Sequence, residues 1–196
     1  MRKFSRLDEP EILKNNWAKW GQEYERERSA GDRQTFKWHE GSYKQILLQL
    51  LKQTDEHCSY CDNAHLKRGD FTIDHFKPKS IPGNYNIAYK WDNLFFCCWH
   101  CQQAKGRQYS EYLLRPDAVD FEFSKYFSYN FTGHEILAND SASHEDQQKA
   151  LETIRIFDLN HLGLIKARRF SFNLYEREKT DSAPVLSDYS YRFLFD

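Results

Sequence analysis

Three stretches of sequence decide the fold of this 196-residue chain: CSYC at 58–61, FTIDHFKPKS at 71–80 and WDNLFFCCWHCQQAKG at 91–106. The first and the last each contain a Cys-x-x-Cys knuckle, a spacing at which a tight turn points both sulfurs at one ion. Four such thiolates form the tetrahedral cage that Zn²⁺ prefers, and they leave no open position for a substrate. The sequence therefore predicts a structural zinc site built from Cys58, Cys61, Cys98 and Cys101.

Two alternatives stay open for this cluster. An iron–sulfur centre also takes four thiolates, and His57, His65 or His100 could replace one of the cysteine ligands. The fifth cysteine, Cys97, fits the knuckle spacing less well. We expect it to be a small buried side chain outside the metal site.

An Asp-His pair lies between the knuckles. Asp74 and His75 follow a predicted strand at 71–73, and adjacent strand residues point to opposite sides. One of them can therefore bind a metal ion while the other faces an attacking water. A neutral histidine is a suitable base near pH 7, and a carboxylate with a second oxygen donor suits Mg²⁺. These are the two functions that hydrolysis of a phosphodiester bond requires: a base for the water and a cation for the charge on the phosphate.

The order Cys-x-x-Cys, Asp-His, Asn-Leu, Cys-x-x-Cys and Lys-Gly resembles the HNH endonucleases, which have a ββα-metal core. The resemblance implies that His75 is the general base and that Asn93 organises the loop and the base. It also implies that Asp74 and Gln102 hold a catalytic Mg²⁺ or Mn²⁺. Gln102 departs from the family pattern, which has His or Asn at this position. Three alternatives follow: the ion sits differently, it binds more weakly, or the site is degenerate.

The chain also resembles a narrower group, the HNH proteins of bacterial Septu (the component PtuB) and retron-associated anti-phage systems. The matching stretches are IDHFKPKS at 73–80, WDNL at 91–94 and, more loosely, TIRIFDLN at 153–160. This resemblance implies an effector of antiviral defence that cleaves nucleic acid, with DNA favoured. It further implies a partner ATPase of the ABC/SMC-like (PtuA-like) type.

The sequence predicts an α+β fold: a zinc-stapled ββα-metal core with mainly helical flanks. We expect a helical segment at 1–55, the nuclease core at 56–110, and a hairpin, helices and a terminal arm at 111–196. Apolar periodicity predicts helices at 9–28, ended by Gly31 and Asp32, and from Ser42 onwards. Further helices are expected from Trp91 towards the second knuckle, at 102–107, at 143–159 and at 160–179. Aromatic residues at 121–131 and the segment 135–137 predict a hairpin, and Leu151, Ile154 and Phe157 are expected to point inward.

Charge is concentrated around the motif. The whole chain has a net charge of -1, but residues 65–110 carry seven lysines and arginines against three aspartates. Lys77, Lys79, Lys105 and Arg107 are candidates for contacts with phosphates, and ordinary surface residues are the alternative. No apolar run approaches the ~20 residues of a membrane span, and MRKFSRLDEP lacks the apolar region of a secretory signal. We therefore expect a cytoplasmic bacterial protein with no membrane partner.

Two questions about function remain at this stage. The motif favours a nuclease, but a non-catalytic, zinc-stabilised nucleic-acid-binding or adaptor module is the alternative. The aromatic residues of the flanks either fill the chain's own core or dock the ATPase. We expect docking through the N-terminal helix or through the C-terminal arm with its aromatic residues Tyr189, Tyr191, Phe193 and Phe195.

Overall fold

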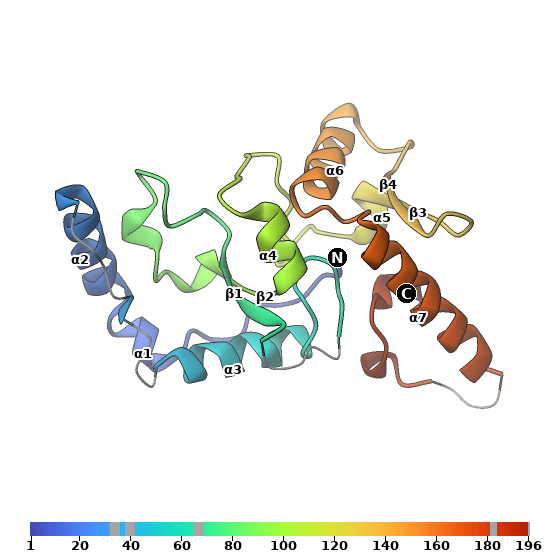
Figure 1. Cartoon of the computed structure of the whole chain (residues 1–196), viewed down its shortest axis with the longest axis horizontal. Helices are drawn as coiled ribbons and strands as arrows, with labels where there is room; N and C mark the ends of the chain where they lie inside the picture. Colours follow the sequence, from blue (N-terminus) through green and yellow to red (C-terminus); the bar gives the residue numbers. More distant parts are fainter. Residues whose placement is uncertain (32–35, 38–41, 65–68, 181–183, 196) are drawn as a thin grey trace.

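The computed structural model describes residues 1–31, 36–37, 42–64, 69–180 and 184–195. It contains both helices and strands, with mainly helical flanks on either side of a central pair of strands (Figure 1). The helices are α1 (Glu11–Lys14), α2 (Trp17–Ala30), α3 (Ser42–Thr54), α4 (Trp99–Lys105), α5 (Phe123–Tyr126), α6 (His144–Ile156) and α7 (Leu162–Glu178). The strands are β1 (Phe71–His75), β2 (Leu94–Cys98), β3 (Phe127–Asn130) and β4 (Glu135–Ala138). Short 3₁₀ turns are η2 (Tyr85–Ile87), η3 (Trp91–Asn93), η4 (Leu186–Asp188) and η5 (Arg192–Leu194).

The central unit is an antiparallel pair of strands followed directly by a helix. β1 pairs with β2 so that Ile73 lies opposite Phe96 and His75 opposite Leu94, and α4 packs on both strands. The prediction of a helix leading from Trp91 to the second knuckle is wrong beyond the single turn η3. Residues 94–98 form a strand because their backbone groups pair with β1, and α4 begins at Trp99, earlier than predicted.

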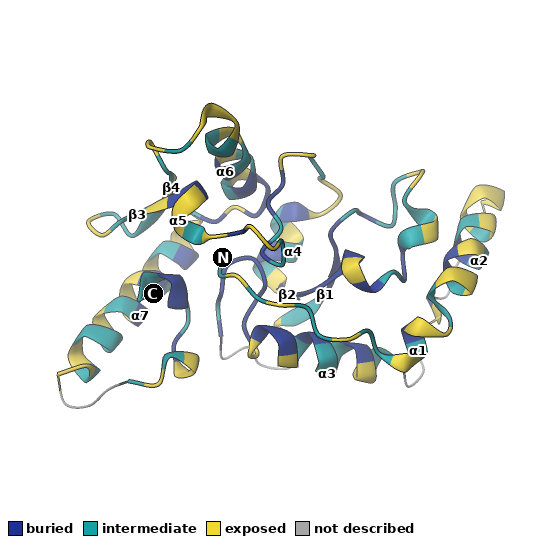
Figure 2. Cartoon of the chain, turned by 180° about the vertical axis from the view of Figure 1, so that it is seen from behind, coloured by how far each residue is buried: buried dark blue, intermediate teal, exposed yellow. Residues whose placement is uncertain are grey.

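β2 separates two hydrophobic cores and is buried along its whole length (Figure 2). Successive side chains of a strand point to opposite faces. Leu94 and Phe96 accordingly pack with the N-terminal helices, whereas Phe95 and Cys97 pack with the knuckles and the C-terminal elements. The central strands thus connect both flanks, and the division of the chain near residues 55 and 110 stays a prediction.

The N-terminal flank contains two helices where one was predicted at 9–28. α1 ends at Lys14 and α2 begins at Trp17. Between them, the Asn16 side chain donates to the carbonyl oxygen of Ile12 (2.8 Å), a bond that competes with continued helix. Gly31 ends α2 in the left-handed conformation at φ 78°, which costs glycine little. Asp32 lies outside the described residues.

The C-terminal flank confirms the predicted hairpin, which is β3 paired with β4. Ser143 caps α6, because its hydroxyl accepts a hydrogen bond from the Asp146 amide (3.1 Å). The prediction that Leu151 points inward is wrong, since Leu151 is 57% exposed. The buried face of α6 instead contains Ala150 and Thr153. Phe157 is buried as predicted, and Ile154 packs against the same core.

The C-terminal arm packs on the chain itself. Tyr191 and Phe193 are buried, and the Arg192 guanidinium lies 2.7 Å from the Asp62 carboxylate. The Tyr191 amide also donates to the Asp62 carbonyl (2.7 Å). The buried ion pair with Asp62 anchors the arm in the chain's own core, which favours the alternative that these aromatic residues fill that core, and docking on an ATPase stays a prediction. Among the helices of the described ranges, none is long and apolar enough to cross a membrane.

Gly21 brings α2 against the loop that precedes β2. A Cβ atom at Gly21 would lie 2.1 Å from the backbone oxygen of Asn86, and backbone atoms move only when the whole segment moves. Asn86 lies in η2 (Tyr85–Ile87), and Ala88 directly follows that turn. Any side chain at position 21 must therefore displace the segment that carries Ala88.

We predict that Gly21→Ala destabilises the protein by about 1–3 kcal/mol, the usual cost of forcing extra atoms into a packed interior. The free energy of unfolding, measured by urea denaturation, checks this. Gln22→Ala, on the exposed side of the same helix, is the matched control and should change stability by less than ~0.5 kcal/mol. Equal stability of the two variants would show that α2 and η2 can separate without cost.

Candidate active site

The four cysteines of the knuckles form one buried cluster. The Sγ atoms of Cys58, Cys61, Cys98 and Cys101 all lie within 4.8 Å of one another, and the Cys61–Cys98 pair is 3.6 Å apart. A tetrahedral zinc with Zn–S bonds of about 2.3 Å places its sulfurs roughly 3.8 Å apart. The donor set and the separations therefore fit a structural zinc ion.

Cys97 and the two described histidines near the knuckles, His57 and His100, lie outside this cluster. Cys97 donates its thiol proton to the carbonyl of Cys98 (3.3 Å), and burial raises the pKa of Cys97 well above its usual value, which keeps it a thiol. His57 contacts the backbone oxygens of Asp55 and Tyr189. His100 contacts the carbonyl of Asp158, and His65 lies outside the described residues.

A hollow of about 410 Å³ lies between β1, the following loop and α4. Its lining residues are Asp74, His75, Pro78, Lys79, Ser80, Trp99, Gln102, Gln103 and Gly106. The hollow thus brings together Asp74, His75 and Gln102, three residues of the motif, with Lys79, one of the predicted phosphate contacts. Asn93 and the cysteines do not line it.

His75 is held as a neutral imidazole with a defined proton position. Its Nε2 lies 2.8 Å from the carbonyl oxygen of Ala88, and a carbonyl only accepts, so Nε2 carries the hydrogen. The lone pair of the neutral ring is therefore on Nδ1. Burial, together with the charge of Lys79, lowers the pKa of His75 well below 6.5. A base that is neutral at pH 7 results.

Asp74 lies beside a buried cation. Its carboxylate accepts a hydrogen bond from the Tyr60 hydroxyl (2.8 Å) and lies 3.2 Å from the ammonium nitrogen of Lys105. Lys105 also donates to the carbonyl of His75 (2.7 Å). Burial raises the pKa of the Asp74 carboxyl, against the opposing effects of Lys105 and Tyr60. Since Lys105 is fully buried, the prediction that it contacts phosphates from the surface is wrong.

Asn93 ties together the two ends of the loop after β1. Its Oδ1 accepts from the Lys77 amide (2.8 Å), and its Nδ2 donates to the carbonyls of Lys77 (3.1 Å) and Ile87 (3.3 Å). Ile87 immediately precedes Ala88, whose carbonyl fixes the His75 ring. The Asn93 amide thus acts on the segment that orients the imidazole.

Two of the residues predicted to contact phosphates, Lys77 and Arg107, do not line the hollow. Lys77 places its ammonium over the Tyr109 ring, 3.8 Å from the Glu111 carboxylate. Arg107 donates to the carbonyl of Ser80 (3.4 Å). Lys79 is the one of the four basic candidates that lines the hollow with its side chain accessible.

The donor set of the hollow fits a hard divalent ion. Asp74 offers carboxylate oxygens and Gln102 an amide oxygen, and Mg²⁺ accepts such donors with water completing its shell. The ammonium of Lys105 lies against the same carboxylate. Its positive charge must weaken the binding of a second cation there.

Sequence reasoning missed three residues of this site: Tyr60, Ala88 and Trp99. Tyr60 lies inside the first knuckle and Trp99 inside the second. Both occupy variable positions of a motif that the sequence reveals, so both could have been selected as candidates from the sequence. Ala88 acts through its backbone carbonyl, which no side-chain pattern reveals.

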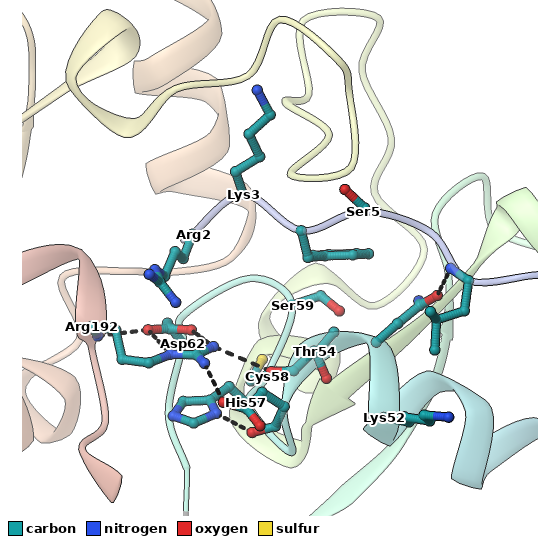
Figure 3. A pocket seen from close by; sticks show the side chains of 14 residues that line it. Arg2, Lys3, Ser5, Lys52, Thr54, His57, Cys58, Ser59, Asp62 and Arg192 are labelled. Atoms are coloured by element: carbon teal, nitrogen blue, oxygen red, sulfur yellow. Dashed lines mark hydrogen bonds and ion pairs between the residues drawn. The ribbon is translucent and has the colours of Figure 1, made fainter. Parts of the chain in front are cut away.

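A second cavity, of about 340 Å³, lies beside the first knuckle (Figure 3). It is lined by the basic residues Arg2, Lys3 and Lys52, but its most buried charges, Arg192 and Asp62, pair with each other (2.7 Å). Both ring nitrogens of its histidine, His57, contact backbone oxygens. His57 therefore has no nitrogen available to take a proton from water, and the hollow at His75 is the better candidate for catalysis.

The comparison with known families agrees with this location. Residues 58–108 match the family model described as HNH endonuclease, a span from the first knuckle to just beyond α4. No curated protein matches the chain. The match identifies an HNH endonuclease domain within the chain.

We predict that the purified protein carries about one zinc per chain, since four thiolates saturate one tetrahedral ion. Elemental analysis checks this, and Cys58→Ser/Cys98→Ser should lose the metal. Cys97→Ser, which alters the neighbouring cysteine, should retain it. Full occupancy in the double variant would show that the cluster is not the zinc site.

We predict that Lys105→Met destabilises the protein by about 3–5 kcal/mol, because it leaves the buried Asp74 carboxylate without its cation. Denaturant titration measures the loss, with the exposed Lys19→Met as control. Adding Asp74→Asn should restore part of the stability by removing the orphaned charge. If Lys105→Met unfolds at the same denaturant concentration as the parent, the ion pair contributes nothing.

Proposed function

We propose that this chain, which contains an HNH endonuclease domain at residues 58–108, is a metal-dependent endonuclease. Its substrate is nucleic acid, with DNA favoured, and its reaction is hydrolysis of phosphodiester bonds. One observation carries the proposal: the imidazole of His75 is fixed through Nε2 in a hollow shared with a carboxylate, an amide and a lysine. A positioned base beside groups that bind cations and phosphate is what this reaction requires.

In the proposed mechanism, Nδ1 of His75 accepts a proton from the attacking water. The low pKa of His75 keeps Nδ1 unprotonated at neutral pH, and the Ala88 carbonyl prevents the ring from turning. Lys79, which lines the hollow, offers positive charge to the substrate phosphate.

The metal ions have separate roles. Asp74 and Gln102 would hold Mg²⁺ or Mn²⁺, which when bound stabilises negative charge on the phosphate and the leaving oxygen. A zinc ion held by the four cysteines would have all its positions filled by protein, so its role would be structural.

The finer proposal of an effector of the Septu or retron-associated type, acting in the cytoplasm with an ABC/SMC-like ATPase, rests on the sequence resemblance. The aromatic arm no longer supports it, because Tyr191 and Phe193 are buried in the chain's own core. Trp17 and Trp20 are likewise partly buried against the N-terminal core. A partner ATPase would have to bind another surface.

The second candidate is a non-catalytic, zinc-stabilised nucleic-acid-binding or adaptor module. Two observations favour it. Lys105 already neutralises Asp74 (3.2 Å), and Gln102 stands where the family has His or Asn. A site whose carboxylate is committed to lysine could keep its fold without binding the catalytic ion.

We predict that the protein cleaves nucleic acid in the presence of Mg²⁺ or Mn²⁺ and that His75→Ala lowers the rate by about 10²–10⁴-fold, the usual contribution of a positioned base. Timed cleavage of labelled DNA and RNA measures this. His144→Ala, which alters an exposed histidine at the start of α6, should cleave like the parent.

The His75→Ala variant must also keep its zinc and its circular dichroism spectrum, because His75 is buried and its loss could disturb the fold. His75→Asn, which keeps a donor for the Ala88 carbonyl but no comparable base, should be equally slow. Undiminished cleavage by either folded variant would remove His75 from the reaction. A parent protein that binds nucleic acid but never cleaves it would favour the adaptor.

A further inference from the structure

The exposed face of α4 carries a large aromatic ring at the edge of the proposed active site. Trp99 is 56% exposed, although Trp17, Trp20 and Trp91 all pack in the N-terminal core. It lines the same hollow as Asp74, His75 and Lys79. An exposed indole gives up the stabilisation that burying its apolar surface would provide. The position of Trp99 beside the proposed reacting groups therefore requires an explanation.

Helical spacing brings Trp99 next to the polar groups of the site. Residues three and four apart lie on one face of a helix, and the hollow is lined by Trp99, Gln102 and Gln103 of α4 and by Gly106 directly after it. This face thus presents an aromatic plane followed by two amides. The backbone N–H of Trp99 donates a hydrogen bond to the carbonyl oxygen of Asp70 (2.7 Å). This bond fixes the start of α4 against the residue that precedes β1.

The hollow has the volume of a small-molecule site and a lysine on its wall. Its volume is about 410 Å³, within the range of roughly 300–1,000 Å³ that small-molecule sites occupy. Lys79 supplies a cation to a phosphate, and the indole supplies a flat apolar surface to a base. Aromatic side chains stack on bases of any sequence, because every base has a π-face.

We propose that Trp99 stacks on an unpaired base next to the scissile phosphate, so that the enzyme acts on nucleic acid with an unstacked nucleotide: a single strand or a locally opened duplex. This rests on the proposed nuclease function and specifies its substrate. Both faces of a base inside an intact duplex are covered by its neighbours, so a ring fixed to α4 can stack only on a base that has left the stack. The shared chemistry is the exposed base face, whether the strand is DNA or RNA.

Binding is measured first, without cleavage. In a His75→Ala background, fluorescence anisotropy compares a labelled single-stranded oligonucleotide with the same sequence as a duplex. The His75→Ala protein should prefer the single strand, and adding Trp99→Ala should weaken that binding by about tenfold to a hundredfold, the usual loss when one stacked base loses its aromatic partner. Trp99→Phe should retain most of the affinity. Equal binding with tryptophan and alanine at position 99 overturns the proposal.

Cleavage gives the second measurement, with DNA and RNA versions of a single strand, a duplex and a duplex containing one bulged base. The protein should cut the single strand and the bulge, and Trp99→Ala should slow both. Phe170→Ala, which removes an even more exposed ring (71%) from α7, is the control and should change neither. Zinc content must be equal in all variants, since Trp99 lies between Cys98 and Cys101.

The outcomes separate the two proposals. Loss of cleavage in His75→Ala with full activity in Trp99→Ala leaves the nuclease function intact and overturns the stacking role. Cleavage of the intact duplex at the rate of the single strand overturns it as well. Absence of metal-dependent cleavage of any of these substrates by the parent protein removes the proposed function, whatever the binding measurements show.

Discussion

The four-sulfur cluster is the constraint on which the proposed active site depends. Cys98 ends β2 and Cys101 lies in the first turn of α4, while Cys58 and Cys61 precede β1 in the chain. Joining these sulfurs to one ion would fix how α4 is rotated over the strands. That rotation places Trp99 and Gln102 in the hollow and turns Lys105 towards Asp74. A structural metal would thus set the geometry of the proposed active site, although none of its cysteine ligands lines that site.

The two lysines beside the hollow, Lys79 and Lys105, affect the proposed base and the proposed metal ligand in opposite ways. The charges of Lys79 and Lys105 help to lower the pKa of His75, which favours a neutral base. The same charge of Lys105 lies against Asp74 and opposes a divalent ion at that carboxylate. Catalysis therefore depends on how strongly Asp74 and Gln102 bind a divalent ion beside the Lys105 side chain.

Local spacing made the knuckles and the Asp-His pair predictable, because each is a short motif whose members act together. Other features depend on contacts that the local pattern does not encode. β2 reads LFFCC and is buried on both faces, so it lacks the alternation that identifies a strand with one exposed face. A lysine after a knuckle is by default a surface residue, and only the fold shows Lys105 paired with a residue 31 positions earlier. The pairing of Arg192 with Asp62 spans 130 positions.

The two flanks contact and stabilise the central unit, and these contacts bear on the question of a partner protein. On the N-terminal side, Phe36 packs edge-on against the His75 ring, with centroids 5.6 Å apart, and α2 supports the segment carrying Ala88 through the close approach at Gly21. On the C-terminal side, Arg192 holds Asp62, the residue after the second cysteine of the first knuckle. One flank thus stabilises the proposed base and the other the metal cluster. The length of the flanks and their aromatic content are accounted for by these contacts, and they therefore give no independent argument for an ATPase.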